Sequence, residues 1–261
     1  MSDKITKNKI SAVIITKNEE KNIERCLNSI VNVVDEVILL DSNSTDSTVS
    51  LAESYEFVKV YSTEWKGYAE TKNYGHSLAN NEYILSIDAD EALDEALQSS
   101  ILDLKKNGLE CAYSFNRITN YCGKWIRHGG WYPDVKIRIF NKNYGQWKGS
   151  HVHETLHVDQ EVIYLKGHCL HFSINSIDEH VERANKYSSL AAQKLIANDK
   201  KGSMIKMIFG PLFKFFSMYL IKGGFKDGYY GDGIASISAR SQAWREMKAR
   251  QLYATHKEEK P

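Results

Sequence analysis

Short apolar segments alternate with segments of helical spacing along the N-terminal part of the chain. Between the first two apolar segments, Ile23, Leu27 and Ile30 recur at a spacing that places them on one face of a helix. This alternation predicts right-handed βαβ units and a parallel sheet, and therefore an α/β fold. Four segments have the β-branched and aliphatic composition of buried strands: residues 10–16, 36–40, 58–61 and 83–87.

Polar side chains directly follow three of these predicted strands. They form the sequences T-K-N-E at residues 16–19, D-S-N-S-T-D at residues 41–46 and D-A-D-E at residues 88–91. The carboxyl ends of parallel strands meet at one edge of a sheet, where open α/β sheets bind their ligands. We therefore expect the three segments to form one site.

Asp88 and Asp90 are the strongest chemical signal in this set. Two carboxylates separated by the small Ala89 can reach one hard cation from the same side. They suit Mg²⁺ or Mn²⁺, which takes its remaining oxygen ligands from water and from a diphosphate. The alternative is that residues 88–91 cap a following helix, predicted over residues 92–106, at its positive end.

Lys72 lies in another helical segment, between the third and fourth predicted strands. It is a candidate for contact with a phosphate group. A single lysine on a helix also occurs as an ordinary solvated residue, with its charged end in water. The spacing alone leaves both interpretations open.

Composition narrows the class of protein. The chain has 261 residues, with 42% hydrophobic and 26% charged content, which is typical of a globular protein. A net charge of +1 provides no overall attraction to nucleic acid. The four cysteines are scattered, so we expect free thiols in a reducing compartment. The polar N-terminus and the lack of an uninterrupted apolar run predict neither export nor a membrane-spanning helix, and hence a cytoplasmic protein.

Residues 153–157 read H-E-T-L-H, a literal H-E-x-x-H. A zinc peptidase needs the two histidines of this motif one turn apart on a helix. The surrounding composition is instead strand-like, and on a strand residues i and i+4 are about 13 Å apart. We expect the match to be accidental, and a zinc hydrolase with His168 and His171 as further ligands remains the alternative.

Residues 204–221 form a mostly apolar helical segment. Lys206 and Lys214 lie on its narrow polar stripe, and Pro211 predicts a kink. Three interpretations are open: a buried helix, a helix lying in a membrane interface, and a surface for a partner subunit. Two elements are predicted to follow it: a glycine-rich turn at residues 223–233 and a basic last helix at residues 234–253.

The order and spacing of these motifs resemble those of family 2 inverting glycosyltransferases. The resemblance rests on T-K-N-E after the first strand, D-S-N-S-T-D-S-T after the second, K-N-Y-G in the next helix and D-A-D after the fourth strand. It covers residues 10–95 most strongly and continues through the segments W-Y-P-D-V-K-I-R-I-F and H-V-H-E. Within the family, the chain is most similar to the bacterial glucosyltransferases that extend the lipopolysaccharide inner core.

The resemblance implies the GT-A fold, an α/β nucleotide-binding fold with a mostly parallel sheet. The GT-A domain would occupy residues 1–200, with a nucleotide half at about residues 8–95 and an acceptor half at about residues 96–175. Residues 201–261 would then form a C-terminal helical extension that can associate with a membrane.

The resemblance also implies roles for single residues. Asp41 would bind the uracil or an equivalent base, Asp88 would face the ribose and Asp90 would hold the divalent metal ion, with Asp88 as a second candidate ligand. The residues implied to contact the nucleotide are Thr16, Lys17, Asn18, Glu19, Asp41, Lys72, Asp88 and Ala89.

An inverting displacement needs a general base that takes the proton of the acceptor hydroxyl. By analogy with the branch of the family that has an H-E motif, Glu154 is the candidate, and Asp134 is its competitor. The acceptor candidates are Trp131, Arg138 and His153, and His153 is also a candidate for contact with the metal ion or the leaving diphosphate.

The implied function is the transfer of a hexose, glucose above others, from a UDP-linked donor to a lipopolysaccharide core or another lipid-linked saccharide. The enzyme would act at the cytoplasmic face of the inner membrane with Mg²⁺ or Mn²⁺, and a homodimer is a further option. A closely related alternative is transfer to polyprenyl phosphate. More distant alternatives are the zinc hydrolase and a nucleotide-sensing membrane adaptor without catalytic activity.

Overall fold

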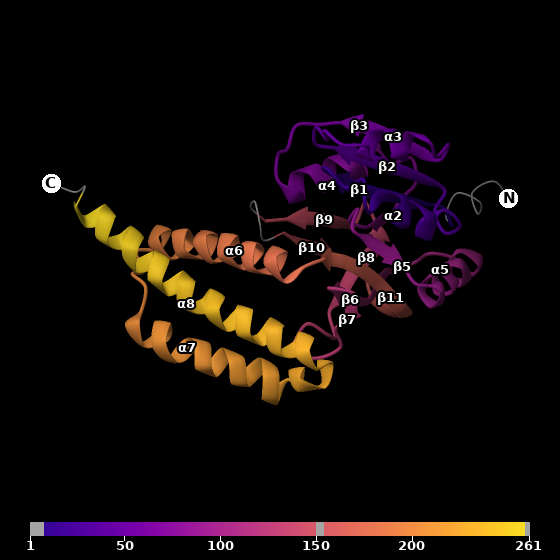
Figure 1. Cartoon of the computed structure of the whole chain (residues 1–261). Coiled ribbons are helices and arrows are strands. Elements are labelled where there is room, and N and C mark those ends of the chain that lie inside the picture. Colours follow the sequence, from indigo (N-terminus) through magenta and orange to yellow (C-terminus); the bar gives the residue numbers. More distant parts are fainter. Residues whose placement is uncertain (1–7, 150–153, 259–261) are drawn as a thin grey trace. The chain divides into compact units, whose positions relative to one another are not determined.

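The computed structural model describes residues 8–149 and 154–258. Its largest element is a nine-stranded sheet in the order β3-β2-β1-β4-β8-β6-β11-β5, with β7 paired to β6 (Figure 1). The strands of this sheet are β1 (Ile10–Thr16), β2 (Glu36–Asp41), β3 (Val58–Ser62), β4 (Tyr83–Ser86), β5 (Glu91–Leu93), β6 (Ala112–Tyr121), β7 (Lys124–Trp125), β8 (Val135–Asn141) and β11 (Val162–Ile174).

The sheet combines a parallel and an antiparallel part. β3, β2, β1 and β4 pair in parallel, as the predicted βαβ units require. β4 with β8, β8 with β6, and β5 with β11 pair antiparallel. Every residue of β1 is buried, as expected for a strand covered on both faces. The carboxyl ends of β1, β2 and β4 therefore lie at one edge, as the sequence predicts.

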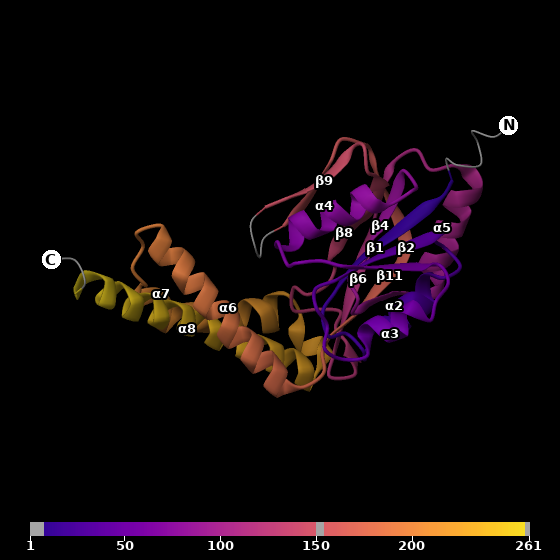
Figure 2. The same cartoon turned by 90° about the horizontal axis from the view of Figure 1, so that it is seen from above.

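Helices cover both faces of the parallel part (Figure 2). Successive residues of β1 point to opposite faces, so Ile10, Ala12 and Ile14 belong to one hydrophobic cluster and Val13 and Ile15 to another. Side chains of α2, α3 and α5 complete the first cluster, and the end of α4 contributes to the second. The helix bounds are α2 (Ile23–Ile30), α3 (Thr48–Glu53), α4 (Tyr68–Leu78) and α5 (Glu95–Asn107).

Helix α4 lies very close to the sheet at Gly75. A Cβ atom at this position would lie 2.5 Å from Val13 Cγ1 and 3.0 Å from Leu40 Cδ1. Only glycine allows this approach without displacing the two side chains. Lys72 precedes Gly75 by one helical turn and is 3% exposed, so the close packing also buries this lysine.

His76 packs on the same side of α4, with its ring 5.2 Å from that of Phe140. Its Nε2 atom is buried and has no hydrogen-bond partner among the described residues. Burial, together with the nearby charges of Lys72 and Lys142, lowers the pKa of His76 to about 4. The imidazole is therefore neutral in the folded protein at any pH near neutrality.

We expect His76 to make the protein less stable in mild acid. In the unfolded chain its pKa returns to about 6.5, so between these two values only the unfolded state binds the proton. Above pH 6.5 His76 is neutral in both states and does not lower the free energy of unfolding. As the pH falls toward 4, protonation of the unfolded state lowers this free energy; at pH 5 the loss is about 2 kcal/mol. Urea unfolding at pH 7 and pH 5 should show this loss in the wild type, with a smaller loss in His76→Leu. The exposed-site control His157→Gln should behave as the wild type, and an equal loss in His76→Leu would contradict the assignment.

The chain after β4 does not continue directly into a helix. Residues Glu91–Leu93 form β5, which pairs with β11. α5 begins at Glu95, and Asp94 caps it by accepting a hydrogen bond from the Leu97 amide at 2.8 Å. The alternative interpretation of residues 88–91 as the cap of a helix over residues 92–106 is therefore wrong.

A separate two-stranded hairpin, β9 (Gly145–Lys148) and β10 (Thr155–Val158), packs beside α4. The side chain of Asn73 exchanges two hydrogen bonds with the backbone of Trp147, at 2.9 and 3.0 Å. His157 lies on strand β10, so the second histidine of the H-E-x-x-H sequence is not on a helix. His153 lies outside the described residues, and the described part of the chain contains no group of three His, Cys, Asp or Glu residues suited to a metal ion. The described residues therefore do not have the helical geometry of a zinc peptidase.

The chain divides into two compact units: Met1–Arg117 with Asp134–Phe172, and Ile118–Pro133 with Ser173–Pro261. The second unit differs from the extension expected at residues 201–261, because α6 packs against α8 and belongs with it. α8 begins within the predicted glycine-rich turn, so residues 229–233 are helical. The helices of this unit are α6 (Ile177–Ala197), α7 (Met204–Phe216), a π-helical turn (Ser217–Ile221), a short 3₁₀ helix (Gly224–Asp227) and α8 (Tyr229–Glu258).

Candidate active site

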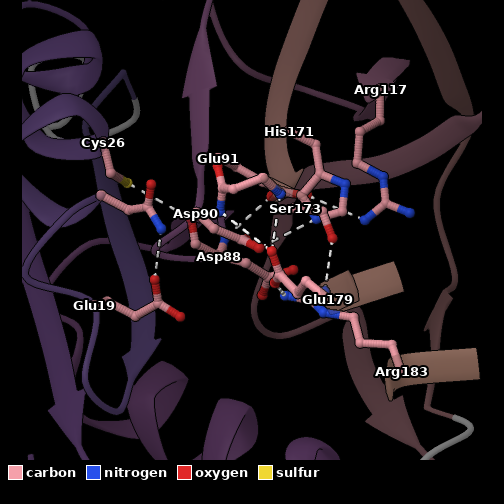
Figure 3. A network of polar contacts seen from close by, with 12 residues as sticks. Glu19, Cys26, Asp88, Asp90, Glu91, Arg117, His171, Ser173, Glu179 and Arg183 are labelled. Atoms are coloured by element: carbon pink, nitrogen blue, oxygen red, sulfur yellow. Dashed lines mark hydrogen bonds and ion pairs between the residues drawn. The ribbon is translucent and has the colours of Figure 1, made fainter. Parts of the chain in front are cut away.

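The acidic turn between β4 and β5 is held by the buried carboxylate of Glu91 (Figure 3). Glu91 Oε2 accepts a hydrogen bond from the Asp88 amide at 3.0 Å. Its Oε1 atom pairs with Arg138 at 2.7 Å and with Arg117 at 3.3 Å. A buried carboxylate with three partners of this kind fixes the backbone of the turn, which sets where Asp88 and Asp90 point.

Asp88 lies between two buried cations. Its carboxylate is 3.1 Å from Lys72 Nζ and 3.1 Å from Arg138 Nη2. Burial by itself raises the pKa of Asp88, but the charges of Lys72 and Arg138 outweigh it and hold that pKa well below its ordinary value. Asp88 is therefore a permanent anion with a fixed orientation.

Asp90 faces His171, which comes from a distant part of the sequence (Figure 3). The register of β5 and β11 pairs His171 with Glu91, and this brings His171 Nε2 to 3.3 Å from the Asp90 carboxylate. The Phe172 amide also donates to the Asp90 carbonyl oxygen at 2.8 Å. One carboxylate and one imidazole form a donor set that fits a divalent ion which takes its other ligands from a diphosphate and water.

The loops after β1 and β2 are joined by hydrogen bonds. Asn18 has a left-handed backbone, with φ of 57°, and its amide donates to Ser44 Oγ at 2.8 Å. Its side-chain oxygen accepts from the Thr45 amide at 2.8 Å. The Glu19 amide donates to Thr48 Oγ1 at 2.7 Å. These contacts make one polar surface from two loops that are far apart in the sequence.

Two predicted nucleotide contacts, Asp41 and Thr16, are buried at this edge. Asp41 is buried, and one of its carboxylate oxygens accepts from the Ser44 amide at 2.9 Å. The buried hydroxyl of Thr16 has no hydrogen-bond partner among the described residues. A buried polar atom without a partner is uncommon in proteins, and a bound ligand is one way to satisfy it.

Lys72 connects the acidic turn to the start of β10. Its Nζ atom lies 3.7 Å from Glu154 Oε1, in addition to its contact with Asp88. The same ammonium group lies over the Trp147 ring, 4.4 Å from the ring centroid. Glu154 and Asp88 thus share one buried cation, although they are far apart in the sequence.

Residues 11–160 match the model of the family described as "Glycosyl transferase family 2". The chain belongs to glycosyl transferase family 2. It is also 36% identical to an uncharacterized glycosyltransferase of Rickettsia bellii, over 97% of this chain and 89% of that protein. The predicted α/β GT-A fold and enzyme class are confirmed, and the interpretation as a non-catalytic adaptor is wrong.

Two further proteins are similar to this glycosyltransferase. The lipopolysaccharide core biosynthesis glycosyltransferase LpsC of Rhizobium meliloti is 29% identical, over 97% of this chain and 94% of LpsC. Among solved structures, that of S. aureus TarS 1-349 in complex with UDP-GlcNAc is 14% identical, with a TM-score of 0.49; the match covers 95% of this chain and 92% of the TarS chain.

The structure of the glycosyltransferase brings most of the predicted site residues together. Thr16, Asp41 and Asp88 lie at the carboxyl ends of neighbouring strands of the parallel sheet. Lys72 of α4 contacts both Asp88 and Glu154, which directly precedes β10. Lys17 is exposed and Ala89 is buried within the acidic turn. Trp131 lies in the other compact unit, where its ring packs edge-on against Tyr121 and His180. His153 lies outside the described residues.

Arg138 has a different place from the one expected. It was predicted to contact the acceptor, but it is 5% exposed and pairs with Asp88 and Glu91. A guanidinium in this position is held by its two carboxylate partners. In the structure, Arg138 is thus a buried support of the acidic turn.

Three residues of the site are not predicted from the sequence. Glu91 and Arg117 complete the support of the turn, and the sequence suggests His171 only as a ligand of the zinc alternative. The acidic residue at the fourth position of D-A-D-E was a signal for Glu91. The partners of His171 depend on the register of β5 and β11, which no local pattern specifies.

A cavity of about 620 Å³ lies elsewhere in the same unit, between α4 and the β9–β10 hairpin. Its lining includes His76, Lys142 and His157, but none of Asp88, Asp90 and Glu154. We place the active site at the strand ends, because the paired carboxylates and the buried cations converge there and not in this cavity.

We expect Glu91→Gln to destabilise the enzyme. The substitution keeps an acceptor for the Asp88 amide but removes the charge that faces Arg138 and Arg117. Hydrogen bonds to charged groups contribute more than neutral ones, so the unfolding free energy should fall by about 2 kcal/mol. Urea unfolding followed by tryptophan fluorescence measures this change. The control Glu95→Gln alters an exposed glutamate four residues away and should shift the stability by less than about 1 kcal/mol; equal effects would contradict the role of Glu91.

Proposed function

We propose that this glycosyltransferase transfers glucose from UDP-glucose to a lipopolysaccharide core or another lipid-linked saccharide, with inversion at the anomeric carbon. The observation that carries the proposal is the convergence of Asp88 and Glu154 on the buried Lys72, beside Asp90. This arrangement provides both an anchor for a charged donor and a carboxylate for the acceptor hydroxyl. The name of the relative LpsC supports the class of acceptor.

In this proposal, Asp90 and His171 hold Mg²⁺ or Mn²⁺, with Asp88 nearby. The ion would neutralise charge that develops on the departing nucleoside diphosphate. Asp88 is fixed between Lys72 and Arg138 and would orient the ribose. Because both cations are already paired with it, Asp88 is a weaker candidate than Asp90 for a direct metal ligand.

The nucleotide would lie along the ends of β1 and β2. Asp41 would accept a hydrogen bond from the uracil ring, and the hydroxyl of Thr16 would gain a partner. The left-handed Asn18 shapes the loop that both groups border. The remaining proposed contacts are those of Lys17, Glu19, Lys72 and Ala89.

Glu154 would act as the general base. As the acceptor oxygen attacks the anomeric carbon, the bond from that carbon to the diphosphate breaks and the hydroxyl proton passes to the Glu154 carboxylate. Asp134 is a poorer base, because Arg117 and Lys136 each pair with it, at 2.9 Å. Burial raises the pKa of Asp134, but Lys136 and Arg117 outweigh it and lower that pKa below its ordinary value.

The proposed place of action is the cytoplasmic face of the inner membrane. Sugar nucleotides are polar and charged, and a lipid-linked acceptor is anchored in a bilayer, so the two meet only at the membrane surface. The free thiols of the described cysteines agree with a reducing compartment.

A donor titration tests this function. UDP-glucose, UDP-galactose, GDP-mannose and ADP-heptose are each titrated by calorimetry with and without Mn²⁺. We expect UDP-glucose to bind most tightly, with an affinity that Mn²⁺ raises by at least about tenfold. Tighter binding of another donor would correct the sugar, and binding of none of the four would overturn the proposed function.

A further inference from the structure

Helix α7 exposes its apolar side. The side chains of Ile205, Phe209 and Phe213 are 71%, 62% and 72% exposed. No residue of α7 is buried, so the interpretation of this segment as a buried helix is wrong. The exposed apolar residues, here called the α7 face, are Met204, Ile205, Ile208, Phe209, Leu212, Phe213, Phe216, Leu220 and Ile221.

The inner side of α7 includes Gly210 and Lys214 and is closely packed. A Cβ atom on Gly210 would lie 2.4 Å from the side-chain nitrogen of Gln242 on α8. Lys214 lines a cavity of about 260 Å³ together with Ser188 of α6 and Arg245 of α8. A soluble bundle buries its apolar side chains and exposes its polar ones. Most of the large apolar side chains of α7 are instead exposed, as in a helix whose outer face contacts lipid.

The charged residues of the segment that carries the α7 face have one sign. Between residues 200 and 226 the chain has no acidic residue. Lysines precede the α7 face in the sequence, lie on α7 itself and follow the face. The exposed ones are Lys200, Lys201, Lys206, Lys222 and Lys226. Lysines that border an apolar helix reach the headgroups of anionic lipids, and each contributes to binding near the surface.

We propose that the α7 face docks on an anionic phospholipid bilayer, with α7 lying in the plane of the headgroups. This inference rests on the proposed function only for its biological setting, because a lipid-linked acceptor lies in such a bilayer. It goes further by assigning the surface and the lipid charge that bring the enzyme there.

The orientation in the plane follows from the neighbour of α7. Met204–Ile221 is the one helical segment of the described chain that is long and apolar enough to cross a membrane, and 6% of it is buried. α7 packs along α8, however, and α8 has the exposed charged residues Arg240 and Arg250. A crossing α7 would either leave α8 or take these charges into the hydrocarbon, which is costly. A helix lying in the interface keeps both its packing and its charges.

A vesicle-binding experiment tests this inference. The full-length enzyme is centrifuged with phosphatidylcholine vesicles that either contain or lack phosphatidylglycerol. We expect the wild type to sediment with the anionic vesicles and much less with the neutral ones. Phe209→Glu/Phe213→Glu should lower the partition coefficient at least about tenfold. The control Val31→Glu/Val162→Glu adds the same charge at two exposed apolar positions of the other compact unit and should bind as the wild type.

A second variant tests the charge. Replacing Lys201, Lys206, Lys222 and Lys226 by Gln should lower binding to anionic vesicles at least about tenfold. The same binding should weaken as the salt concentration rises. Circular dichroism and the Mn²⁺-dependent binding of UDP-glucose show whether each variant is folded.

Three outcomes would overturn the inference. One is a wild type that does not sediment with anionic vesicles, and another is equal binding by Phe209→Glu/Phe213→Glu. The third is a stable dimer that dissociates in that variant while vesicle binding is absent, because a second copy would then cover the α7 face. Vesicle binding does not require catalysis. Loss of donor binding would therefore count against the proposed function, and loss of vesicle binding against the docking surface.

Discussion

Asp90→Asn should abolish the metal dependence of this glycosyltransferase. The substitution keeps the size of the side chain but removes the negative charge that faces His171 at 3.3 Å. Without this carboxylate the proposed metal site keeps only the imidazole of His171 from this pair. A metal ion would then no longer be held there to neutralise the charge on the departing diphosphate. We expect kcat/KM to fall at least about 1000-fold, equivalent to about 4 kcal/mol of transition-state stabilisation. UDP release in a transfer assay measures this fall.

Calorimetry separates loss of metal binding from loss of structure. Asp90→Asn should bind UDP equally with and without Mn²⁺, whereas the wild type should respond to the ion. The control Asp103→Asn removes an exposed carboxylate of α5 that pairs with Lys106 at the surface, and it should retain activity. A fully active Asp90→Asn enzyme would contradict the assignment of Asp90 as a metal ligand.

Glu154→Gln should stop transfer while donor binding persists. The amide still occupies the position 3.7 Å from Lys72 but accepts no proton from the acceptor hydroxyl. General-base catalysis contributes about 10²–10⁴-fold, so we expect kcat to fall by that factor. The affinity for UDP-glucose with Mn²⁺ should stay within about threefold of the wild type, because Glu154 is assigned to the acceptor.

The same variant distinguishes the two acceptor classes. A polyprenyl phosphate is already ionised and needs no base, so transfer to it would survive Glu154→Gln. Loss of activity therefore favours a hydroxyl acceptor, and retained activity would favour the phosphate acceptor. The control Glu161→Gln alters an exposed glutamate between β10 and β11, and this variant should remain active. If it were as inactive as Glu154→Gln, neither effect could be assigned to base catalysis.

The strand ends of the nucleotide half could be predicted because their signals are local. The apolar composition of residues 10–16 and 83–87 and the polar residues that follow them specify buried strands and their ends. Parallel pairing then places Thr16, Asp41 and Asp88 at one edge. The described end of the H-E-x-x-H segment, Thr155–Val158, is a strand, as expected from its β-branched neighbours.

The supports of the acidic turn could not be predicted, because they come from other strands. Arg138 was expected on the acceptor, yet it points between Asp88 and Glu91 in the folded chain. Side chains alternate between the two faces of the sheet along β8, so the sequence allows Arg138 on either face. Only the pairing of β8 with β4 and β6 determines which face it takes. The same applies to Arg117, which reaches Glu91 from β6.

The sequence by itself determined the α/β class, the family and the acidic pair at the end of the fourth strand. These depend on periodicity and short motifs, which neighbouring residues encode. Tertiary structure alone decided that His171 faces Asp90, that Lys72 joins Asp88 to Glu154, and that α7 turns its apolar side outward. Each of these depends on strand register or helix packing between distant segments. An apolar helix has the same sequence whether it faces a core or the outside, and only its packing partners determine which side is exposed.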